Sequence, residues 1–307
     1  MIQENRPATL RKEYAAEWPS RRRPNRPRLL LDEPSLDRIY FISFFLGGVD
    51  DEHQRTSFCI FYSISSGIGL RQPQTVLIPQ IADGGGWQTT FVLTNTTINA
   101  GSATLTFYQE TSGGATQSWN LPFVEAIGQN VQIPAASTLF LHTRGTNVAT
   151  STGWAQLIVS SGMTAYAIFT LRVPGRPDQD GTAPGGSSST GILVPFDNAN
   201  GSVTGLALTN PSTVSETISI NIKTDTGAIS QATLSLPAQG HLAFALPDRL
   251  PATAGHSGLA EFYMPPRTGG GISAIALRFN ATGAFTSAPV YASGGTAIIG
   301  VIPGGAK

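Results

Sequence analysis

The sequence predicts an all-β fold, with two tandem antiparallel β-sandwich (Ig-like) domains behind a poorly ordered N-terminal region. Three observations predict this class. Charged residues make up only 12% of the chain, which is rich in Gly (34) and Pro (21), whereas soluble domains are about 25% charged. Apolar residues alternate with hydroxyl residues at period two, as in half-buried strands. The chain beyond residue 72 also repeats itself in four blocks.

The duplication decides the domain organisation. Four segments match four later segments in the same order: "LIPQIADGGGWQTTFVLTN" (77–95) with "LVPFDNANGSVTGLALTN" (193–210), "VQIPAASTLFLHT" (131–143) with "LSLPAQGHLAFAL" (234–246), "GWAQL" (153–157) with "GLAEF" (258–262), and "AYAIFTLR" (165–172) with "SAIALRF" (273–279). Each copy holds about 110 residues, the size of one β-sandwich. We therefore expect the first sandwich at 73–186 and the second at 187–307.

Individual strands are visible inside both copies. "SATLTFY" (102–108) alternates apolar with hydroxyl residues, and "ETISINIKT" (216–224) does so with isoleucines on one side. This period is typical of antiparallel strands with one buried face. Further strands are expected at 139–142, 154–159, 165–171, 232–236, 242–246, 259–263 and 274–279. Turn residues separate them at about ten-residue spacing, as in sandwiches.

Three consecutive glycines, Gly84 to Gly86, form the most motif-like stretch of the chain. A phosphate-binding loop needs a helix after it. Here the following "TTFVLTN" has the pattern of a strand, and the second copy lacks the glycine run. The sequence therefore predicts a hairpin connection whose glycines adopt positive φ.

Two stretches lie outside the repeat. "GRPDQDGTAPGGSSST" (175–190) predicts a linker, or a long loop that closes the first sandwich. Residues 1–72 are rich in Arg and Pro, which predicts a basic, poorly ordered region. Its two apolar runs, 39–49 and 58–70, are both shorter than the ~20 residues that cross a bilayer.

The N-terminal region also bears on location. A basic leader before a short apolar run is loosely typical of an export signal, and "SRRR" (20–23) resembles part of a twin-arginine signal. We expect a secreted or cell-envelope protein with no transmembrane segment. The alternative is that the two runs are strands, or that the gene start is misplaced.

Composition argues against several classes of function. The formal net charge is zero, so we expect no nucleic-acid partner. The single cysteine, Cys59, excludes an internal disulfide framework and a cysteine-based zinc site. The four histidines are scattered without metal-ligand spacing. We expect His142 and His241, which lie in strand-like runs, at surface or hydrogen-bonded positions.

Two short motifs resemble reactive or metal-binding sites. Asp178 and Asp180 precede a glycine as in a calcium loop, but Ser189 stands where an EF-hand needs a bidentate carboxylate. A looser calcium site at these two aspartates stays open beside an ordinary solvated loop, and we expect no other cofactor. "GHSG" (255–258) resembles a nucleophile elbow, but a strand-like "LAEFY" follows it, so a turn is expected.

Aromatic residues of the first copy are the candidate ligand-binding groups. Trp87, Trp119 and Tyr108 have faces on which sugar rings stack. Trp154 matches Leu259 of the second copy, which favours a core position, whereas Trp87 and Trp119 lie near turns. The candidate partner is a polysaccharide or a cell surface, and ordinary packing of the three rings is the alternative.

Several blocks resemble an uncharacterised tandem β-sandwich repeat of exported and surface-associated proteins of soil bacteria: "LIPQIADGGGWQTTFVLTN", "TLTFYQE", "GWAQL", "AYAIFTLRVPGRPDQDGTAP", "ILVPFDN", "GLAEFY" and "ALRFNATGAFTSAPV". The resemblance spans 73–297. It implies an extracytoplasmic module and brings no catalytic residues. The expected function is a non-catalytic spacer or an adhesive, presentation domain, and the alternative is a carbohydrate-binding module; no enzyme is expected.

Overall fold

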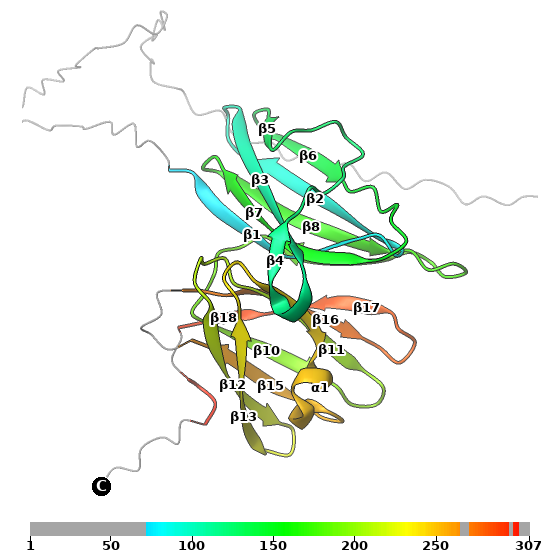
Figure 1. Ribbon diagram of the computed structural model, residues 1–307, viewed down its shortest axis with the longest axis vertical. Helices are drawn as coiled ribbons and strands as arrows, with labels where there is room; N and C mark the ends of the chain where they lie inside the picture. Colours follow the sequence, from blue (N-terminus) through cyan, green and yellow to red (C-terminus); the bar gives the residue numbers. More distant parts are fainter. Residues whose placement is uncertain (1–71, 265–269, 295–296, 301–307) are drawn as a thin grey trace, which may run out of the picture. The chain divides into compact units, whose positions relative to one another are not determined.

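A computed structural model of the chain describes residues 72–264, 270–294 and 297–300. The predicted N-terminal region, with Cys59 and both apolar runs, lies outside these residues except for residue 72. Within the described part, the fold is almost entirely antiparallel β (Figure 1). The only helical elements there are α1 (Leu246–Arg249) and the 3-10 turns η1 (Ser112–Gly114) and η2 (Pro251–Thr253). The all-β prediction is confirmed.

The first sandwich pairs two sheets. One sheet has the order β1-β7-β3-β4, with β5 also paired to β3. The other has the order β6-β2-β8-β9. Their bounds are β1 (Gln74–Asp83), β2 (Trp87–Asn95), β3 (Gly101–Glu110), β4 (Thr116–Ser118), β5 (Asn130–Ile133), β6 (Ser137–His142), β7 (Ser151–Val159), β8 (Met163–Leu171) and β9 (Gln179–Pro184).

The second sandwich has the same plan. Its sheets have the orders β13-β12-β15-β10-β18 and β14-β11-β16-β17. The bounds are β10 (Gly191–Asp197), β11 (Val203–Thr209), β12 (Glu216–Thr224), β13 (Ile229–Leu236), β14 (His241–Ala245), β15 (Ser257–Tyr263), β16 (Ser273–Phe279), β17 (Phe285–Ala288) and β18 (Tyr291–Ser293). Strand by strand, β14-β11-β16-β17 repeats β6-β2-β8-β9, and β10-β15-β12 repeats β1-β7-β3.

The two copies also use the same side chain to fix the same corner. Asn95 ends the first "LTN" block, and its Nδ2 donates to the carbonyl oxygens of Asn99, Ile133 and Pro134 at 2.8, 3.2 and 3.0 Å. Asn210 ends the second block and makes the equivalent set, with the carbonyl oxygens of Val214, Leu236 and Pro237 at 2.8, 3.4 and 2.9 Å. A buried amide that satisfies three carbonyls holds the chain reversal in place, which gives this sequence match a structural cause.

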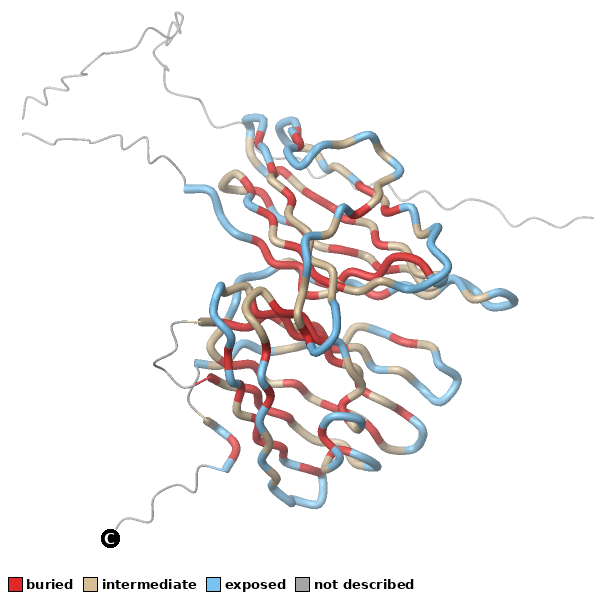
Figure 2. The backbone as a smooth tube through the Cα atoms, in the orientation of Figure 1, coloured by how far each residue is buried: buried red, intermediate tan, exposed pale blue. Residues whose placement is uncertain are grey.

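Buried residues form two apolar clusters (Figure 2). One is the core of the second sandwich, and the other is the core of the first sandwich extended by Ala207, Ile275 and Phe285 of the second. In β12, Ile218, Ile220 and Ile222 are buried while Thr217 is exposed, as the period-two pattern predicts. Trp154 is fully buried, which agrees with its predicted core position.

The triple glycine is a hairpin turn, as predicted. Gly84, Gly85 and Gly86 have φ of 82, 62 and 92°. Gly84 and Trp87 exchange two backbone hydrogen bonds of 3.0 Å, which closes a two-residue connection between β1 and β2. Side chains with a Cβ rarely adopt such φ values, so the glycines are required by the backbone.

The predicted linker at 175–190 is partly wrong, because β9 (Gln179–Pro184) pairs with β8. Gly181 and Ala183 of β9 face inward and are buried, while Asp180 and Thr182 are exposed. The alternation is inconspicuous in the sequence because glycine and proline supply two of the six residues of the strand. The remaining connection is itself hydrogen-bonded: Gly186 pairs with Leu77 of the first sandwich, and Ser189 with Ile272 of the second.

Candidate functional site

The contact between the two sandwiches is the most elaborate polar feature of the described residues. It begins at the turn between β13 and β14, where Gln239 has a φ of 53°. The Gln239 carbonyl oxygen accepts from Trp154 Nε1 at 2.9 Å and from Thr116 Oγ1 at 2.7 Å. Its side-chain Nε2 donates to the Tyr108 hydroxyl at 3.1 Å. One residue of the second sandwich thus reaches three residues of the first.

His241 extends this junction two residues further along. Its side chain has no exposed surface. Nδ1 lies 2.8 Å from Glu110 Oε2, and Nε2 lies 3.1 Å from the Pro79 carbonyl oxygen and 3.0 Å from Gln80 Oε1. A carboxylate and a backbone carbonyl can only accept. Nε2 therefore donates to the Pro79 carbonyl oxygen, and the ring is held between Pro79 and the carboxyl group of Glu110.

A second set of contacts joins β17 to β9. Ser287 Oγ accepts from the Thr182 backbone N at 2.8 Å and donates to the Thr182 carbonyl oxygen at 2.8 Å. Nearby, Gln179 Oε1 accepts from the Phe285 backbone N at 3.3 Å. β14 and β17 are the two edges of one sheet, so that sheet is attached to the first sandwich at both edges.

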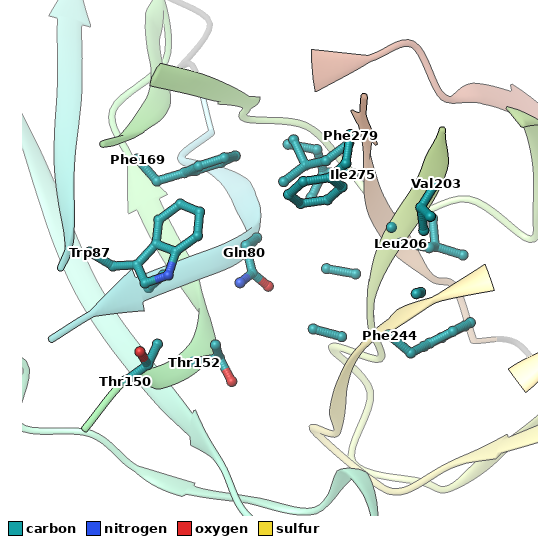
Figure 3. Close-up of a pocket in the computed structure, with 16 residues that line it drawn as sticks. Gln80, Trp87, Thr150, Thr152, Phe169, Val203, Leu206, Phe244, Ile275 and Phe279 are labelled. Carbon is teal, nitrogen blue, oxygen red and sulfur yellow. The ribbon is translucent and has the colours of Figure 1, made fainter. Parts of the chain in front are cut away.

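A cavity of about 320 Å³ lies between the two sandwiches (Figure 3). Trp87 and Phe169 line it from the first sandwich, and Phe244 and Phe279 from the second. Its polar lining groups are neutral: Gln80, Thr150 and Thr152. None of the described residues that line it has an ionisable side chain.

A second cavity of about 250 Å³ lies on the first sandwich. The indole of Trp119 lines it beside Phe107, and its polar lining includes the amides of Asn120 and Gln129 and the hydroxyl of Ser118. Aromatic surface with neutral hydrogen-bonding groups around it is the chemistry that suits a sugar ring.

The three predicted ligand-binding residues do not form one platform. Trp87 is half-buried in the cavity between the sandwiches, with ring centroids 6.2 Å from Phe169 and 5.5 Å from Phe285. Tyr108 lines neither cavity and stacks on Trp154, with centroids 4.3 Å apart and planes 10° apart. Burial raises the pKa of the Tyr108 phenol. Of the three predicted residues, Trp119 alone lines the polar cavity.

The predicted calcium ligands are each engaged with a neighbour on or just beyond β8. Asp178 Oδ2 lies 3.1 Å from Arg172 Nε, and Asp180 Oδ1 accepts from Thr170 Oγ1 at 2.6 Å. Within the described residues, no group of three or more His, Cys, Asp or Glu side chains is placed to hold a metal ion. The arrangement is that of a salt bridge and a cross-strand hydrogen bond.

Two further histidines pair with carboxylates at the surface. His142 Nδ1 lies 2.6 Å from Glu125 Oε1, and His256 Nδ1 lies 2.9 Å from Asp225 Oδ1. Partial burial by itself raises the pKa of Glu125, but the hydrogen bonds from His142 outweigh it and hold that pKa below its ordinary value. The hydrogen bond from His256 is the main cause that lowers the pKa of Asp225.

The "GHSG" segment is a turn that leads into β15, as expected, because β15 begins at Ser257. Ser257 Oγ and His256 Nδ1 both bond to Asp225, at 3.3 and 2.9 Å. A nucleophilic serine would instead need a hydrogen bond to the histidine.

Neither a family model nor a curated protein matches the sequence of this chain. None of the helices in the described residues has the length and apolar character to cross a membrane. The fold and the junction define an all-β protein of two antiparallel sandwiches with the same strand order.

Sequence reasoning missed the junction residues, although the repeat held a signal for them. Aligned on the "P-A" pair of their turns, Gln239 corresponds to Ala136 and His241 to Thr138. Ala136 and Gln239 share a positive φ, 48 and 53°. The two turns therefore have the same backbone, and only the second carries side chains that reach the other sandwich.

Proposed function

We propose that the chain is a non-catalytic module in which the two sandwiches act as one stiff unit, serving as a spacer or as an adhesive, presentation domain outside the cytoplasm. The observation that carries the proposal is the Gln239 and His241 junction. His241 is buried and Gln239 is half-buried, and separating the sandwiches would break all of their hydrogen bonds at once, each at a cost in free energy. A spacer needs this stiffness, because a flexible linker would not hold a partner at a fixed distance.

The connection between the sandwiches supports the same proposal. Gly186 is bonded to the first sandwich and Ser189 to the second, with backbone distances of 2.7 to 3.1 Å. Only two residues separate these anchors, so the chain has little freedom to act as a hinge.

Stiffness can be measured between two spin labels. Ile158 in β7 and Ile229 in β13 are 45% and 51% exposed and lie in different sandwiches. In a Cys59→Ser background, Ile158→Cys and Ile229→Cys carry the labels, and we expect a single narrow distance distribution. Adding His241→Ala should broaden it. A broad distribution in the protein with an intact junction, or turnover of glycoside, ester or peptide substrates, would contradict the proposal.

The second candidate function is polysaccharide binding at the Trp119 cavity. It is favoured by the two amides and the hydroxyl beside the indole. A glycan array and polysaccharide pull-down with Trp119→Ala test it, and Trp87→Ala is the matched control because Trp87 lines the other cavity. We expect only Trp119→Ala to abolish binding. Retention of binding by Trp119→Ala, or equal loss in both variants, counts against this site.

A further inference from the structure

One side of the cavity between the sandwiches, called the floor below, carries only very small residues of β11 and β14. Gly205–Ala245 and Ala207–Ala243 are cross-strand pairs of the second sandwich. At the matching positions of the first sandwich, the pairs are Thr90–His142 and Val92–Phe140. All four residues of the second sandwich line the cavity. With nothing larger than a methyl group at these positions, the sheet leaves room where the first sandwich has side chains.

The walls are also held at a fixed separation. The floor lies on β11 and β14 of the sheet whose edges are β14 and β17. His241 ties β14 to Glu110, and Ser287 ties β17 to Thr182, both at 2.8 Å. Between these edges the sheet also packs against β1, because Ala207 and Ile275 are buried in the same apolar cluster as Ile78. The contacts hold the two sandwiches in place around the remaining space. A preformed pocket at a domain interface is a common ligand site.

The lining specifies the chemistry of the ligand. The rings of Trp87 and Phe169 face the space from one side, and those of Phe244 and Phe279 from the other (Figure 3). A carboxylate or ammonium group would lie there without a counter-charge, which is costly in an apolar site. Thr150, Thr152 and Gln80 offer neutral hydrogen bonds on the side of the first sandwich.

We propose that this cavity binds a neutral, ring-bearing small molecule with one hydroxyl or carbonyl group. The flat ring stacks against the aromatic walls and the floor of small residues, and its polar group meets the threonines and Gln80. The volume of about 320 Å³ corresponds to about ten water molecules, so a bicyclic compound of roughly 10 to 15 non-hydrogen atoms fits. The inference is independent of the Trp119 cavity and of the spacer role.

The probe is 2-naphthol, with naphthalene-2-sulfonate as its charged counterpart. Isothermal titration of the full chain should give 2-naphthol a dissociation constant below about 1 mM, and the sulfonate at least a tenfold weaker one. Absence of 2-naphthol binding at that concentration overturns the proposal. Equal or tighter binding of the sulfonate also overturns it. The Arg249 guanidinium, 5.9 Å from the Phe244 ring centroid, would then be binding the anion, and the site would not select a neutral ligand.

Two alanine variants locate the binding. Ala243 is an exposed strand residue of the floor, so Ala243→Leu fills the cavity with little risk to folding. Ala292 is an equally exposed strand residue in β18, away from the cavity, and Ala292→Leu is the control. We expect Ala243→Leu to weaken 2-naphthol binding at least tenfold and Ala292→Leu to leave it unchanged. An unchanged affinity in Ala243→Leu, with both variants folded by thermal melting, refutes this site.

Discussion

Replacing His241 by alanine tests whether the junction holds the two sandwiches together. The substitution deletes a fully buried ring and its bonds to Glu110, Pro79 and Gln80. Each buried group left without its hydrogen-bond partner costs about 1–3 kcal/mol, and the deleted ring leaves a cavity. Glu110 keeps 18% of its side chain exposed and a 3.2 Å bond from Thr152. Because water can partly replace the lost partner at Glu110, we expect a total loss of about 3 kcal/mol.

His142→Ala is the matched control for this prediction. His142 pairs with Glu125 at 2.6 Å, as His241 pairs with Glu110, but the two side chains are 43% and 31% exposed. Exposed ion pairs contribute about 0–1 kcal/mol. Urea unfolding followed by tryptophan fluorescence gives both free energies. If His241→Ala loses less than about 1 kcal/mol, or no more than His142→Ala, the junction does not stabilise the protein as described.

Three further substitutions test local features. Asn210→Asp should lower the free energy of unfolding by about 3 kcal/mol, because a buried carboxylate cannot donate to three carbonyls; urea unfolding should show almost no change in the exposed control Asn99→Asp. Gly153→Ala should cost more than about 2 kcal/mol by the same assay, because its Cβ would overlap the Tyr108 carbonyl, whereas Gly128→Ala has open space and should be neutral. A mild Gly153→Ala would mean that β7 and β3 can separate freely. For Asp197, the hydrogen bond from Arg278 holds the pKa below its ordinary 3.8. The ionised carboxylate therefore stabilises the fold above pH 3.8, and this is lost as the pH falls through the folded value. The melting-temperature difference from Asp197→Asn should be constant near neutral pH and vanish in acid; a difference that persists in acid would contradict this assignment.

The strands follow from short-range information, whereas the order of the sheets depends on distant pairings such as that of β1 with β7. Period-two alternation in β3 and β12 depends only on neighbours two residues apart. The corners are only partly local, because Asn95 and Asn210 each bond to one carbonyl four residues further on and to others on a distant segment. Thr89 and Thr204 each bond to the backbone of the residue seven positions earlier. The sequence predicts the strands and the repeat, and the structure adds these contacts.

The junction depends on long-range information. His241 is buried by Glu110 and Pro79, which are 131 and 162 residues away. No local pattern distinguishes a buried histidine of this kind from one at the surface, such as His142. A comparison of the two copies contains the missing signal, because Gln239 in the turn and Ala243 in β14 differ from their counterparts, Ala136 and Phe140, where the chain contacts the other sandwich.

The two tryptophans predicted as ligand-binding groups illustrate why residue type was not enough. Trp87 and Trp119 both follow turns in the first copy, and both are half-buried. The second sandwich covers Trp87, so its indole contacts Phe285 and lies opposite small apolar residues. Trp119 lines a cavity formed by the first sandwich alone, where Asn120 and Gln129 remain exposed. The neighbouring domain adds apolar residues around the Trp87 indole, whereas Trp119 lies among residues of the first sandwich alone. The same residue type is therefore suited to an apolar ring in one cavity and to a sugar in the other.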